Sequence, residues 1–507
     1  MDEKVGIMGY GVCIPIERIA VEKLVRNREA RRKDLNDFLA KIRDGLLLRY
    51  KSIANYSEDT TTISAEAAEN AIRMAGIDPK LIRSVALGTE SKPYAVGLAA
   101  RHVASFTGMG ENVFVADLEG ACNAGMQAVN YIMSQIKSGV IDYGMAIGSD
   151  VSQAPIRDAL EYSAGAGAAA LVMGRDDLVA SIEDMAPCSS LSLDFWRRDE
   201  MLVPKHFGRT TVEVYTYHVV GAMEELLRRH PDLKISDFEY ITFHQPSGYM
   251  PLKVCKALAA PKIEVGCDPA VQDRLRIPQE DIEKKVKPWL TVLETGNTYA
   301  ASTPIAIATI LDKARPGDDI LAVSYGSGAY TIATWLRAED GIIKKAKHVR
   351  SVQDYVNHRR EIEFRTYAAY LDERTRRGKK RLKYPRIIAE VEPMGEEMLE
   401  IVTCRSCNRV YYPIRSRCLQ YDCAGPLEKL RLPKRAILKR LKPLPPRQSR
   451  IFSCDVLRKG GVFIVDADMT ELKPGIELEA VTRRLDYEGS EGLILYGPCY
   501  RPLFRDY

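Results

Sequence analysis

Apolar segments of strand length alternate with amphipathic segments of helix length through residues 1–340. This alternation is typical of an α/β protein whose sheets are buried between helices. Two segments, 140–152 and 317–329, both run from Asp through an apolar strand into a Gly/Ser turn. A further apolar strand follows each of them, at 168–174 and 330–336. A duplicated half is the economical interpretation, although any α/β protein contains such strands.

The pattern changes beyond residue 340. Glycines become scarce and charged runs such as RRGKKRLK dominate, which predicts a basic, helical connector. A cysteine cluster follows, then the proline-rich stretch PKRAILKRLKPLPPRQ, and then short alternating strands separated by Gly and Pro turns. Such strands predict a small β-barrel. We therefore expect five units, covering residues 1–175, 176–340, 341–398, 399–430 and 431–507.

The composition is that of a globular protein, with 46% hydrophobic and 28% charged residues. At 507 residues the chain is long enough for two to four domains. Its apolar runs are interrupted well before the roughly 20 residues of a membrane helix. The segment MDEKVGIMGYGVCIP at the start resembles a first strand and not a signal peptide. We expect a cytoplasmic protein without a membrane span.

The net charge of +5 conceals a regional asymmetry. Residues 341–450 contain 28 Lys and Arg against 12 Asp and Glu, so this region carries +16 and the rest of the chain −11. A basic region beside a small barrel could indicate nucleic-acid binding. However, the barrel strands have few aromatic residues interleaved with basic ones, and charge runs are mostly solvated faces. Nucleic acid is therefore the less favoured partner.

Cys122 occupies a turn of small residues between an apolar strand, 112–117, and a helix. The partial positive charge at a helix N-terminus favours the thiolate, which is the nucleophilic form. Gly120 and Gly125 would let a substrate approach closely. The sequence therefore suggests a catalytic nucleophile, and the alternative is a small buried residue.

Two further candidates also come directly after apolar strands. Glu90 ends the strand in SVALGTE and could serve as a general base once burial raises its pKa. The alternative is a solvated carboxylate. His244 ends the strand in DFEYITFH and is a candidate proton carrier for the thiol. Because α/β enzymes assemble sites from the loops at strand ends, we expect these residues to meet Cys122.

Four cysteines are clustered in the pattern CRSC-x10-CLQYDC, namely Cys404, Cys407, Cys418 and Cys423. In a chain without an export signal, such a cluster favours a metal site over disulfides. Four thiolates suit tetrahedral zinc, and because they would fill all four positions the zinc would be structural. The second pair is spaced more widely than usual. The alternative is a lost site whose thiols remain.

Several ordered motifs resemble the archaeal type of 3-hydroxy-3-methylglutaryl-CoA (HMG-CoA) synthase, a member of the thiolase superfamily. The likeness covers residues 1 to about 336. The motifs are GTESKPYAV, EGACNAGMQAV, DFWRRDEMLVPKHFGR, FHQPSGYMPLK, GNTYAAS and SYGSGA. The zinc ribbon and barrel resemble the OB-fold proteins that accompany thiolases and such synthases.

The resemblance implies a duplicated thiolase-like fold in α-β-α-β-α layers, followed by a zinc ribbon and an OB-type barrel. It implies that Cys122 carries the acetyl group, that Glu90 removes a methyl proton from it, and that His244 binds the second substrate. Backbone N–H groups near Cys122 and Gly326 would form an oxyanion hole. The residues implied in substrate binding are Asn297, His206, Arg209, Asp194, Gly326 and Ser327.

The resemblance further implies coenzyme A thioesters as substrates, a homo-oligomer, and docking to an acetoacetyl-CoA thiolase. The phosphates of coenzyme A would account for local Lys and Arg. Two alternatives stay open. One is a related condensing or thiolytic enzyme acting on another acyl-CoA, because the long charged segment between the His244 helix and GNTY could reshape the acyl pocket. The other is a noncatalytic scaffold for a thiolase or RNA.

Overall fold

The computed structural model describes most of the chain. The described residues are 4–152, 154–198, 201, 203–260, 268–345, 350–375, 400–411, 416–420, 422–442, 450–454, 462–467, 472–487 and 493–503. Among them, no helix is both long and apolar enough to cross a membrane.

A nine-stranded sheet forms the centre of the molecule, in the order β11-β12-β13-β8-β1-β7-β6-β4-β5. Its first half contains β1 (Gly6–Cys13), β4 (Ser84–Gly88), β5 (Phe114–Leu118), β6 (Gly144–Val151) and β7 (Ala166–Gly174). Its second half contains β8 (Ala180–Ser192), β11 (Tyr240–Phe243), β12 (Asp319–Val323) and β13 (Gly328–Ala338).

The two halves repeat one pattern of strand pairing. β4 is parallel to β6, which is antiparallel to β7, which is antiparallel to β1. In the same way β11 is parallel to β12, which is antiparallel to β13, which is antiparallel to β8. The halves join where β1 meets β8. The two similar segments of the sequence contain β6 and β12, which occupy equivalent places, as a duplicated half predicts.

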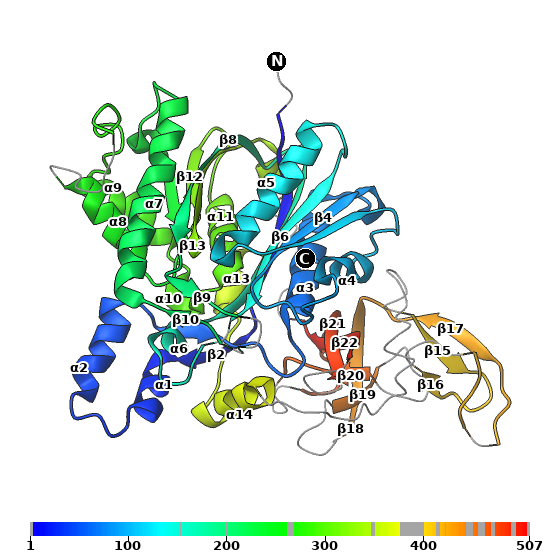
Figure 1. Ribbon diagram of the computed structural model, residues 1–507. Helices are drawn as coiled ribbons and strands as arrows, with labels where there is room; N and C mark the ends of the chain where they lie inside the picture. The colour runs from blue at the N-terminus through cyan, green and yellow to red at the C-terminus, as the bar shows by residue number, and fades with distance from the viewer. Residues whose placement is uncertain are drawn as a thin grey trace.

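Helices cover the strands in layers (Figure 1). Against the first half pack α3 (Thr60–Ala75) and α4 (Ala99–Phe106), and against the second half packs α7 (Gly208–Arg229), followed by α8 (Tyr249–Ala259). Two central helices, α5 (Ala124–Lys137) and α11 (Ser302–Leu311), contact each other. Because α11 contacts strands of both halves, the central helices lie between them. The arrangement is a thiolase-like α/β fold.

The segment after the sheet packs into this body. It contains α12 (Gly341–Lys345), α13 (Val352–Asn357) and α14 (Phe364–Thr375). Val352 and Tyr355 are 1% exposed and belong to the central core. The described part of this segment is mainly helical, as expected, but it is more than a connector, because Val352 and Tyr355 complete the core. The rest of the expected connector, 376–398, lies outside the described residues.

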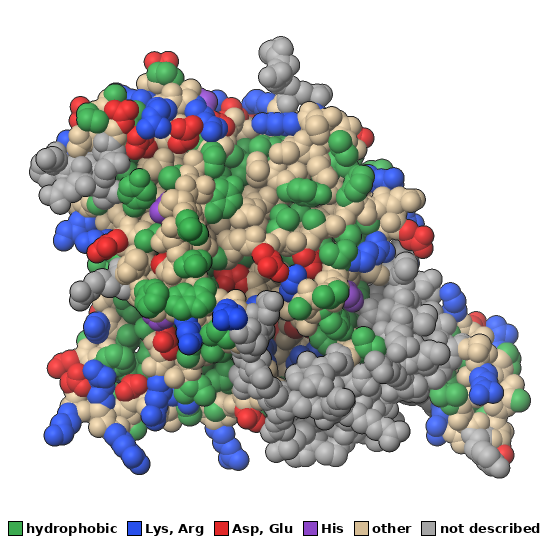
Figure 2. Space-filling view, viewed as in Figure 1, with side chains coloured by type: hydrophobic (Ala, Val, Ile, Leu, Met, Phe, Trp, Pro, Cys, Tyr) green, Lys and Arg blue, Asp and Glu red, His purple; other side chains and the backbone are tan. Residues whose placement is uncertain are grey.

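Shorter elements form a small sheet and two helices outside the central sheet. β14 (Arg360–Glu361), β2 (Glu17–Ala20) and β3 (Tyr50–Ser52) form a small sheet. β2 leads into α1 (Val21–Arg28), and α2 (Leu35–Ala40) follows. Lys and Arg side chains gather along the lower edge of Figure 2, over α1 and α2. Many are paired, as in the ion pairs of Lys23 with Glu361 and of Arg28 with Glu161. Residues 21–50 still hold nine Lys and Arg against five Asp and Glu, so this edge keeps an excess of positive charge.

The C-terminal part forms two small β structures. A three-stranded sheet contains β15 (Glu400–Cys404), β16 (Val410–Tyr411) and β17 (Leu427–Arg431). A closed five-stranded barrel follows in the order β18-β19-β20-β22-β21. Its strands are β18 (Arg435–Lys442), β19 (Arg450–Cys454), β20 (Val462–Ile464), β21 (Glu477–Tyr487) and β22 (Ile494–Pro502). The sheet ends at Arg431, one residue beyond the expected boundary at 430, and the barrel strands lie between residues 435 and 502.

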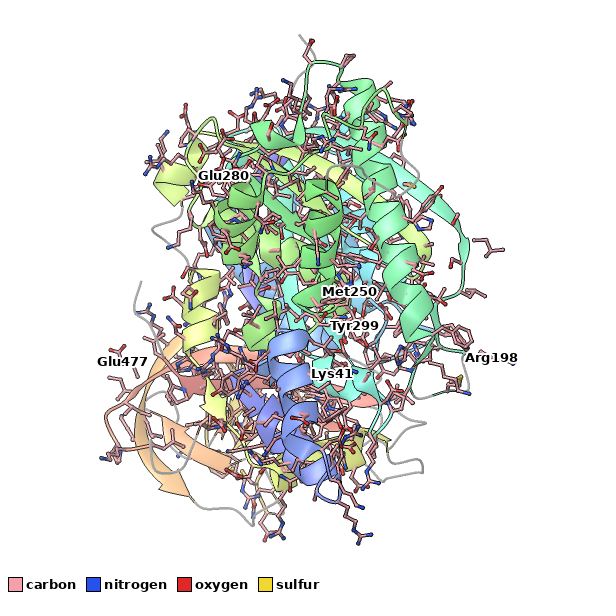
Figure 3. The ribbon with its side chains drawn as sticks, turned by 90° about the vertical axis from the view of Figure 1, so that its left-hand side faces the viewer. Lys41, Arg198, Met250, Glu280, Tyr299 and Glu477 are labelled. Atoms are coloured by element: carbon pink, nitrogen blue, oxygen red, sulfur yellow. The ribbon has the colours of Figure 1, made fainter. Side chains whose placement is uncertain are left out.

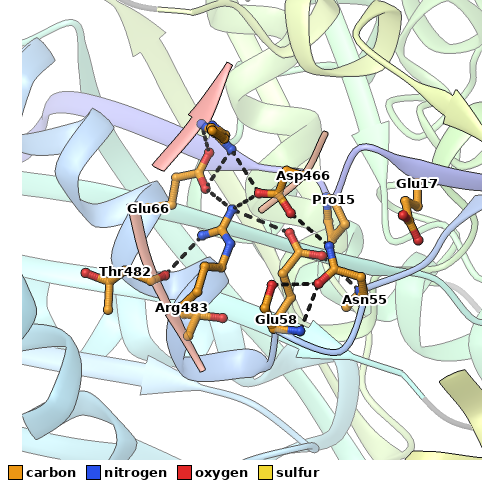
Figure 4. Close-up of polar contacts among 12 residues, drawn as sticks. Pro15, Glu17, Asn55, Glu58, Glu66, Asp466, Thr482 and Arg483 are labelled. Atoms are coloured by element: carbon orange, nitrogen blue, oxygen red, sulfur yellow. Dashed lines mark hydrogen bonds and ion pairs between the residues drawn. The ribbon is translucent and has the colours of Figure 1, made fainter. Parts of the chain in front are cut away.

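A buried ionic cluster joins the barrel to α3 (Figure 4). The guanidinium of Arg483, on β21, lies 3.0 Å from Glu66 of α3 and 2.7 Å from Asp466. Arg501, on β22, contacts the other oxygen of Glu66 at 2.7 Å. Glu58 lies 3.5 Å from Arg483. Because all these side chains are almost fully buried, the barrel is an integral part of the folded chain.

Candidate active site

Cys122 lies at a strained turn between β5 and α5. A single 3₁₀ turn, Ala121–Asn123, connects the two elements, and Ala121 adopts a φ of 50°, which is rare for a residue with a side chain. Strain of this kind persists where the surrounding structure imposes it and is common at active sites. The Cys122 side chain is buried, beside Ala154, Ala164 and Tyr299.

Glu90 reaches Cys122 from the neighbouring strand. It follows β4, which pairs in parallel with β5, so both side chains emerge at the same end of the sheet. The Glu90 carboxyl is hydrogen-bonded to the Cys122 thiol. Its Oε1 is buried without a hydrogen-bond partner among the described residues. The two residues predicted to act together are therefore in contact, with one carboxyl oxygen free for a substrate.

A second buried carboxylate, Asp150, supports Glu90 from the end of β6. Its Oδ1 accepts hydrogen bonds from the Glu90 N–H at 2.8 Å and from the Thr89 and Ser91 hydroxyls at 2.9 and 2.6 Å. Its Oδ2 accepts from the N–H of Ala300 at 2.9 Å. Burial and the charge of Asp150 raise the pKa of Glu90 to about 8. A carboxylate of this basicity suits removal of a proton from carbon near neutral pH.

The thiol is not activated in the way that the sequence suggested. Burial and the neighbouring carboxylates Glu90, Asp150 and Asp194 raise the pKa of Cys122 well above its ordinary value. The expectation that the helix N-terminus favours the thiolate is thus wrong for the resting site. Desolvation and negative charge outweigh the partial charge of one helix end. Cys122 rests as a thiol and must give up its proton as it attacks.

His244 lies at the end of β11 and is 1% exposed. Its backbone N–H donates to the backbone carbonyl of Val323, and its backbone carbonyl accepts a hydrogen bond from the hydroxyl of Tyr215. Burial lowers the pKa of the imidazole to about 3, so the ring is neutral at neutral pH. Its Nδ1 has no hydrogen-bond partner among the described residues. Such a ring suits hydrogen bonding to a substrate carbonyl better than carrying a charge.

Asn297 and Tyr299 approach the same site from the turn before α11. The Oδ1 of Asn297 accepts the N–H of Tyr299 at 2.9 Å, which stabilises this turn. Tyr299 has a φ of 46° and its hydroxyl is buried without a partner among the described residues. Its pKa is raised by burial and by the nearby Glu90 and Cys122. Figure 3 shows Tyr299 in the interior, away from surface residues such as Glu280.

Asp194 and Ser327 form the opposite wall. The Asp194 carboxylate accepts from the hydroxyls of Tyr325 at 3.2 Å and Ser327 at 3.4 Å. Gly326 packs so closely on the Cys122 turn that an added Cβ would lie 2.2 Å from the carbonyl oxygen of Gly120. However, the N–H of Gly326 donates to the carbonyl of Tyr330 at 2.8 Å. This N–H is therefore engaged within the turn and is not free to bind an oxyanion.

The described contacts of His206 and Arg209 do not include Cys122, Glu90 or His244. The Nε2 of His206, on β10 (Lys205–His206), lies 2.9 Å from Asp158. β10 pairs with β9 (Phe195–Trp196), and the N–H of Phe207 donates to the carbonyl of Asp194, so His206 lies close to the Asp194 wall. Arg209 is in the first turn of α7, and its side chain lies outside the described residues.

The four clustered cysteines converge in the C-terminal sheet. The sulfurs of Cys404, Cys407, Cys418 and Cys423 all lie within 4.8 Å of one another. The pairs Cys404–Cys423 and Cys407–Cys418 are each 3.6 Å apart. Zn–S bonds of about 2.3 Å in a tetrahedron require sulfurs about 3.8 Å apart, so this cluster fits zinc.

Sequence reasoning missed Asp150, Tyr299 and Asn123. Asp150 ends an apolar strand just as Glu90 does, so the same pattern could have identified it. The side chain of Asn123 is buried, and neither its oxygen nor its nitrogen has a partner among the described residues. No sequence signal distinguishes Tyr299 or Asn123, because their importance comes from packing against Cys122 and Gly326.

Comparison with known proteins identifies relatives over most of the chain. Residues 51–185 match the thiolase N-terminal domain, and residues 269–338 match the C-terminal domain of 3-oxoacyl-[acyl-carrier-protein] synthase III. The hydroxymethylglutaryl-CoA synthase of Methanothermobacter thermautotrophicus is 38% identical over 72% of this chain and 97% of the relative. That of Methanopyrus kandleri is 37% identical over 75% of this chain and 99% of the relative.

Solved structures show the same fold at lower identity. An HMG-CoA synthase crystallised with CoA superposes with a TM-score of 0.63 at 24% identity, over 75% of this chain and 95% of the other. PksG, an HMG-CoA synthase from Bacillus subtilis, gives 0.63 at 20% identity, over 77% of this chain and 95% of the other. About a quarter of this chain extends beyond each match.

Proposed function

This chain belongs to the hydroxymethylglutaryl-CoA synthase family, and from that premise we propose that it condenses acetyl-CoA with acetoacetyl-CoA to HMG-CoA through an acetyl thioester on Cys122. It is an acyl-CoA acyltransferase of the thiolase superfamily. The observation that carries the proposal is the contact between the Cys122 thiol and a strongly basic Glu90. The site also contains buried polar atoms of Glu90, Asn123, His244 and Tyr299 that have no partner in the described part of the chain and can bind a substrate.

The first step is acetylation of Cys122. Because the thiol is hydrogen-bonded to Glu90, the carboxylate receives the thiol proton as the sulfur attacks the acetyl carbonyl. The thioester bond of acetyl-CoA breaks, and the leaving thiolate takes the proton from Glu90. Glu90 is then a carboxylate again. Backbone N–H groups of Cys122 and Ser327 stabilise the oxyanion that forms on the carbonyl.

The second step forms the new carbon–carbon bond. Glu90 removes a proton from the methyl group of the acetyl thioester, and the resulting enolate attacks the ketone of acetoacetyl-CoA. The alkoxide that forms on the ketone oxygen takes up the proton held by Glu90, which becomes a carboxylate again. The neutral imidazole of His244 donates a hydrogen bond to a carbonyl of this second substrate. The side-chain amide of Asn297 donates to its thioester carbonyl. Water then hydrolyses the bond to Cys122, which releases HMG-CoA and restores the thiol.

Asp194 and Ser327 shape the wall beside the acetyl group, and His206 and Arg209 contribute from the loop around α7. We include them as substrate-binding residues because Asp194 connects the Gly326 turn to the β9–β10 hairpin. Tyr299 completes this wall with a hydroxyl that can donate to the substrate.

The activity test is incubation of the purified protein with acetyl-CoA and acetoacetyl-CoA. We expect HMG-CoA and free CoA to appear, and intact mass spectrometry with acetyl-CoA alone should show one acetyl group on Cys122. Absence of both products would refute the condensation. An adduct that forms from a different acyl-CoA in a panel would instead indicate a related enzyme with another substrate. An unmodified Cys122 with every acyl-CoA would favour a noncatalytic scaffold.

The C-terminal part has a separate proposed role. The four-cysteine sheet would hold one structural zinc, and the closed barrel would be of the OB type. We propose that this part docks an acetoacetyl-CoA thiolase and that the enzyme is a homo-oligomer. The proposed compartment is the cytoplasm, where a reducing environment keeps such a thiol cluster available for metal. Size-exclusion chromatography with and without the thiolase tests both assemblies.

A further inference from the structure

The loop that carries Glu90 is held at both of its ends. It covers residues 89–98, between β4 and α4. At the first end, Asp150 accepts hydrogen bonds from Thr89, Glu90 and Ser91. Near the second end, the hydroxyl of Tyr94 accepts a hydrogen bond of 2.7 Å from the N–H of Ile494. Ile494 is the first residue of β22, a strand of the barrel that lies 400 residues further along the chain.

The barrel strand β22 also contacts α3, and the N-terminus of α3 in turn contacts the loop 89–98. The hydroxyl of Tyr496 donates to Asp59 at 2.8 Å, and Asp59 is the residue that caps the N-terminus of α3. The Tyr496 ring is 1% exposed and packs against Ala65 of α3 and Phe106 of α4. Ile494 and Tyr496, the first and third residues of β22, thus contribute to one interface with the catalytic body.

The first residue of α3 continues the connection to the catalytic base. The Thr60 hydroxyl donates to the carbonyl of Ser91 at 2.7 Å. The Ser91 hydroxyl in turn donates to Asp150 at 2.6 Å, and Asp150 accepts the N–H of Glu90. A continuous series of contacts therefore runs from Tyr496 through the α3 N-terminus and Ser91 to the backbone of Glu90. A displacement of β22 would therefore move the loop at two points, at Tyr94 through Ile494 and at Ser91 through the N-terminus of α3.

We propose that the barrel strand β22 is an intramolecular positioning element for Glu90, with Tyr496 and the pair Ile494–Tyr94 as its points of contact. The proposal rests on the proposed role of Glu90 as the base. A base must be held close to its reactive geometry, and a displacement of about 1 Å can cost on the order of 100-fold in rate. The barrel acts through the loop and does not touch the substrate, so these are positioning residues.

Two variants test the proposal and a third is matched to them. Tyr496→Phe removes the hydrogen bond to Asp59, and Tyr94→Phe removes the acceptor for the N–H of Ile494. Tyr500→Phe is the control, because Tyr500 lies on the same strand, is equally buried, and its hydroxyl donates within the C-terminal part, to the carbonyl of Pro433. All three variants keep the aromatic ring, so packing is preserved.

The first measurement is amide hydrogen exchange of residues 89–98. We expect exchange to become about tenfold faster in Tyr496→Phe and Tyr94→Phe and to stay unchanged in Tyr500→Phe. The second is the kinetics of condensation, at a temperature well below the unfolding of every variant. We expect kcat to fall on the order of 10-fold in the first two variants with KM unchanged, whereas the control keeps the kcat of the parent protein.

Either arm can overturn the proposal. Unchanged exchange in the loop would mean that the barrel does not hold it. A loosened loop with an unchanged kcat would mean that the base does not need this support, and equal losses in Tyr500→Phe would indicate a general loss of stability. Failure of the proposed function has a different signature. In that case the parent protein would form no HMG-CoA from acetyl-CoA and acetoacetyl-CoA, and the exchange measurement would still decide whether the barrel holds the loop.

Discussion

Two buried groups of carboxylates in this molecule behave in opposite ways. In the active site, Glu90 and Asp150 are buried together, and the pKa of Glu90 rises to about 8. At the junction of the barrel with α3, Glu66 is almost fully buried too, but its pKa lies well below the ordinary value. Burial alone would raise both. The difference is that Arg501 and Arg483 contact Glu66, whereas Glu90 contacts a thiol and lies beside another acid.

Glu58 shows how local this effect is. It belongs to the same junction, but it lies 3.5 Å from Arg483 and close to the negative Asp466. Burial and Asp466 outweigh the arginine, and the pKa of Glu58 rises to about 8. Glu66, which accepts hydrogen bonds from two arginines, is therefore a fixed charge that joins two parts of the fold. Glu90, whose carboxyl accepts none from an arginine among the described residues, can change its protonation state, which catalysis requires.

The largest expected effect is that of Cys122→Ser. We expect condensation to fall on the order of 10³-fold or more and the acetyl adduct to disappear from the intact mass, because a hydroxyl is a far weaker nucleophile than a thiol. The folded state should be unaffected, since serine fits the same turn, and thermal unfolding checks this. Turnover close to that of the parent protein would refute covalent catalysis at this residue.

Glu90→Gln separates catalysis from stability. We expect kcat to fall by roughly 10² to 10⁴-fold, because the amide cannot accept the methyl proton. Unfolding should occur at the same or a higher temperature, since burial and Asp150 disfavour the Glu90 carboxylate more than Arg197 favours it. Calorimetry and steady-state kinetics on the same sample measure both. A large loss of stability together with the loss of activity would mean that Glu90 is structural, as Glu66 is.

Arg483→Met should give the reverse result. It leaves Glu66 and Asp466 buried with one fewer cation, which we expect to lower the free energy of unfolding by about 3–5 kcal/mol. Denaturant titration measures this, and condensation per folded molecule should fall much less than in Glu90→Gln. An unchanged stability would show that water or Arg501 replaces the lost guanidinium.

The pH dependence of condensation tests the raised pKa directly. Because Glu90 must be ionised to act as a base, the rate should fall as the pH drops below about 8, approaching tenfold per pH unit. Asp150→Asn removes a negative charge that raises this pKa, so the acid limb should move to lower pH. Rates across a pH series for both proteins provide the measurement. A limb that stays in place would mean that another group controls it.

Removal of zinc should have the smallest effect on chemistry. We expect metal analysis to find about one zinc per chain and Cys404→Ser to abolish it, because three thiolates bind far less well than four. Condensation by the folded protein should stay within about twofold, since the cluster lies outside the site around Cys122. Absence of zinc from the parent protein would refute the metal site, and a strong loss of condensation would refute its independence.

Much of the fold and part of the site follow from the sequence. The alternation of strands and helices predicts the α/β body, and the repeated segments around β6 and β12 predict its internal symmetry. Glu90, Cys122 and His244 are recognisable because each comes at the end of an apolar strand. The spacing of the four cysteines predicts their convergence. All of these are local patterns, and a local pattern is visible in the chain itself.

Only the tertiary structure decided which side chains surround each reactive group. The raised pKa of the Cys122 thiol, the support of Glu90 by Asp150, and the contact of Tyr94 with Ile494 all depend on residues that are distant in sequence. Arg483 and Glu66, which join the barrel to the body, are 417 residues apart. Burial and charge act over a few ångströms of space, and the sequence does not state which segments come that close. It therefore determined which residues could react, and the packing of remote segments decided how each one is ionised.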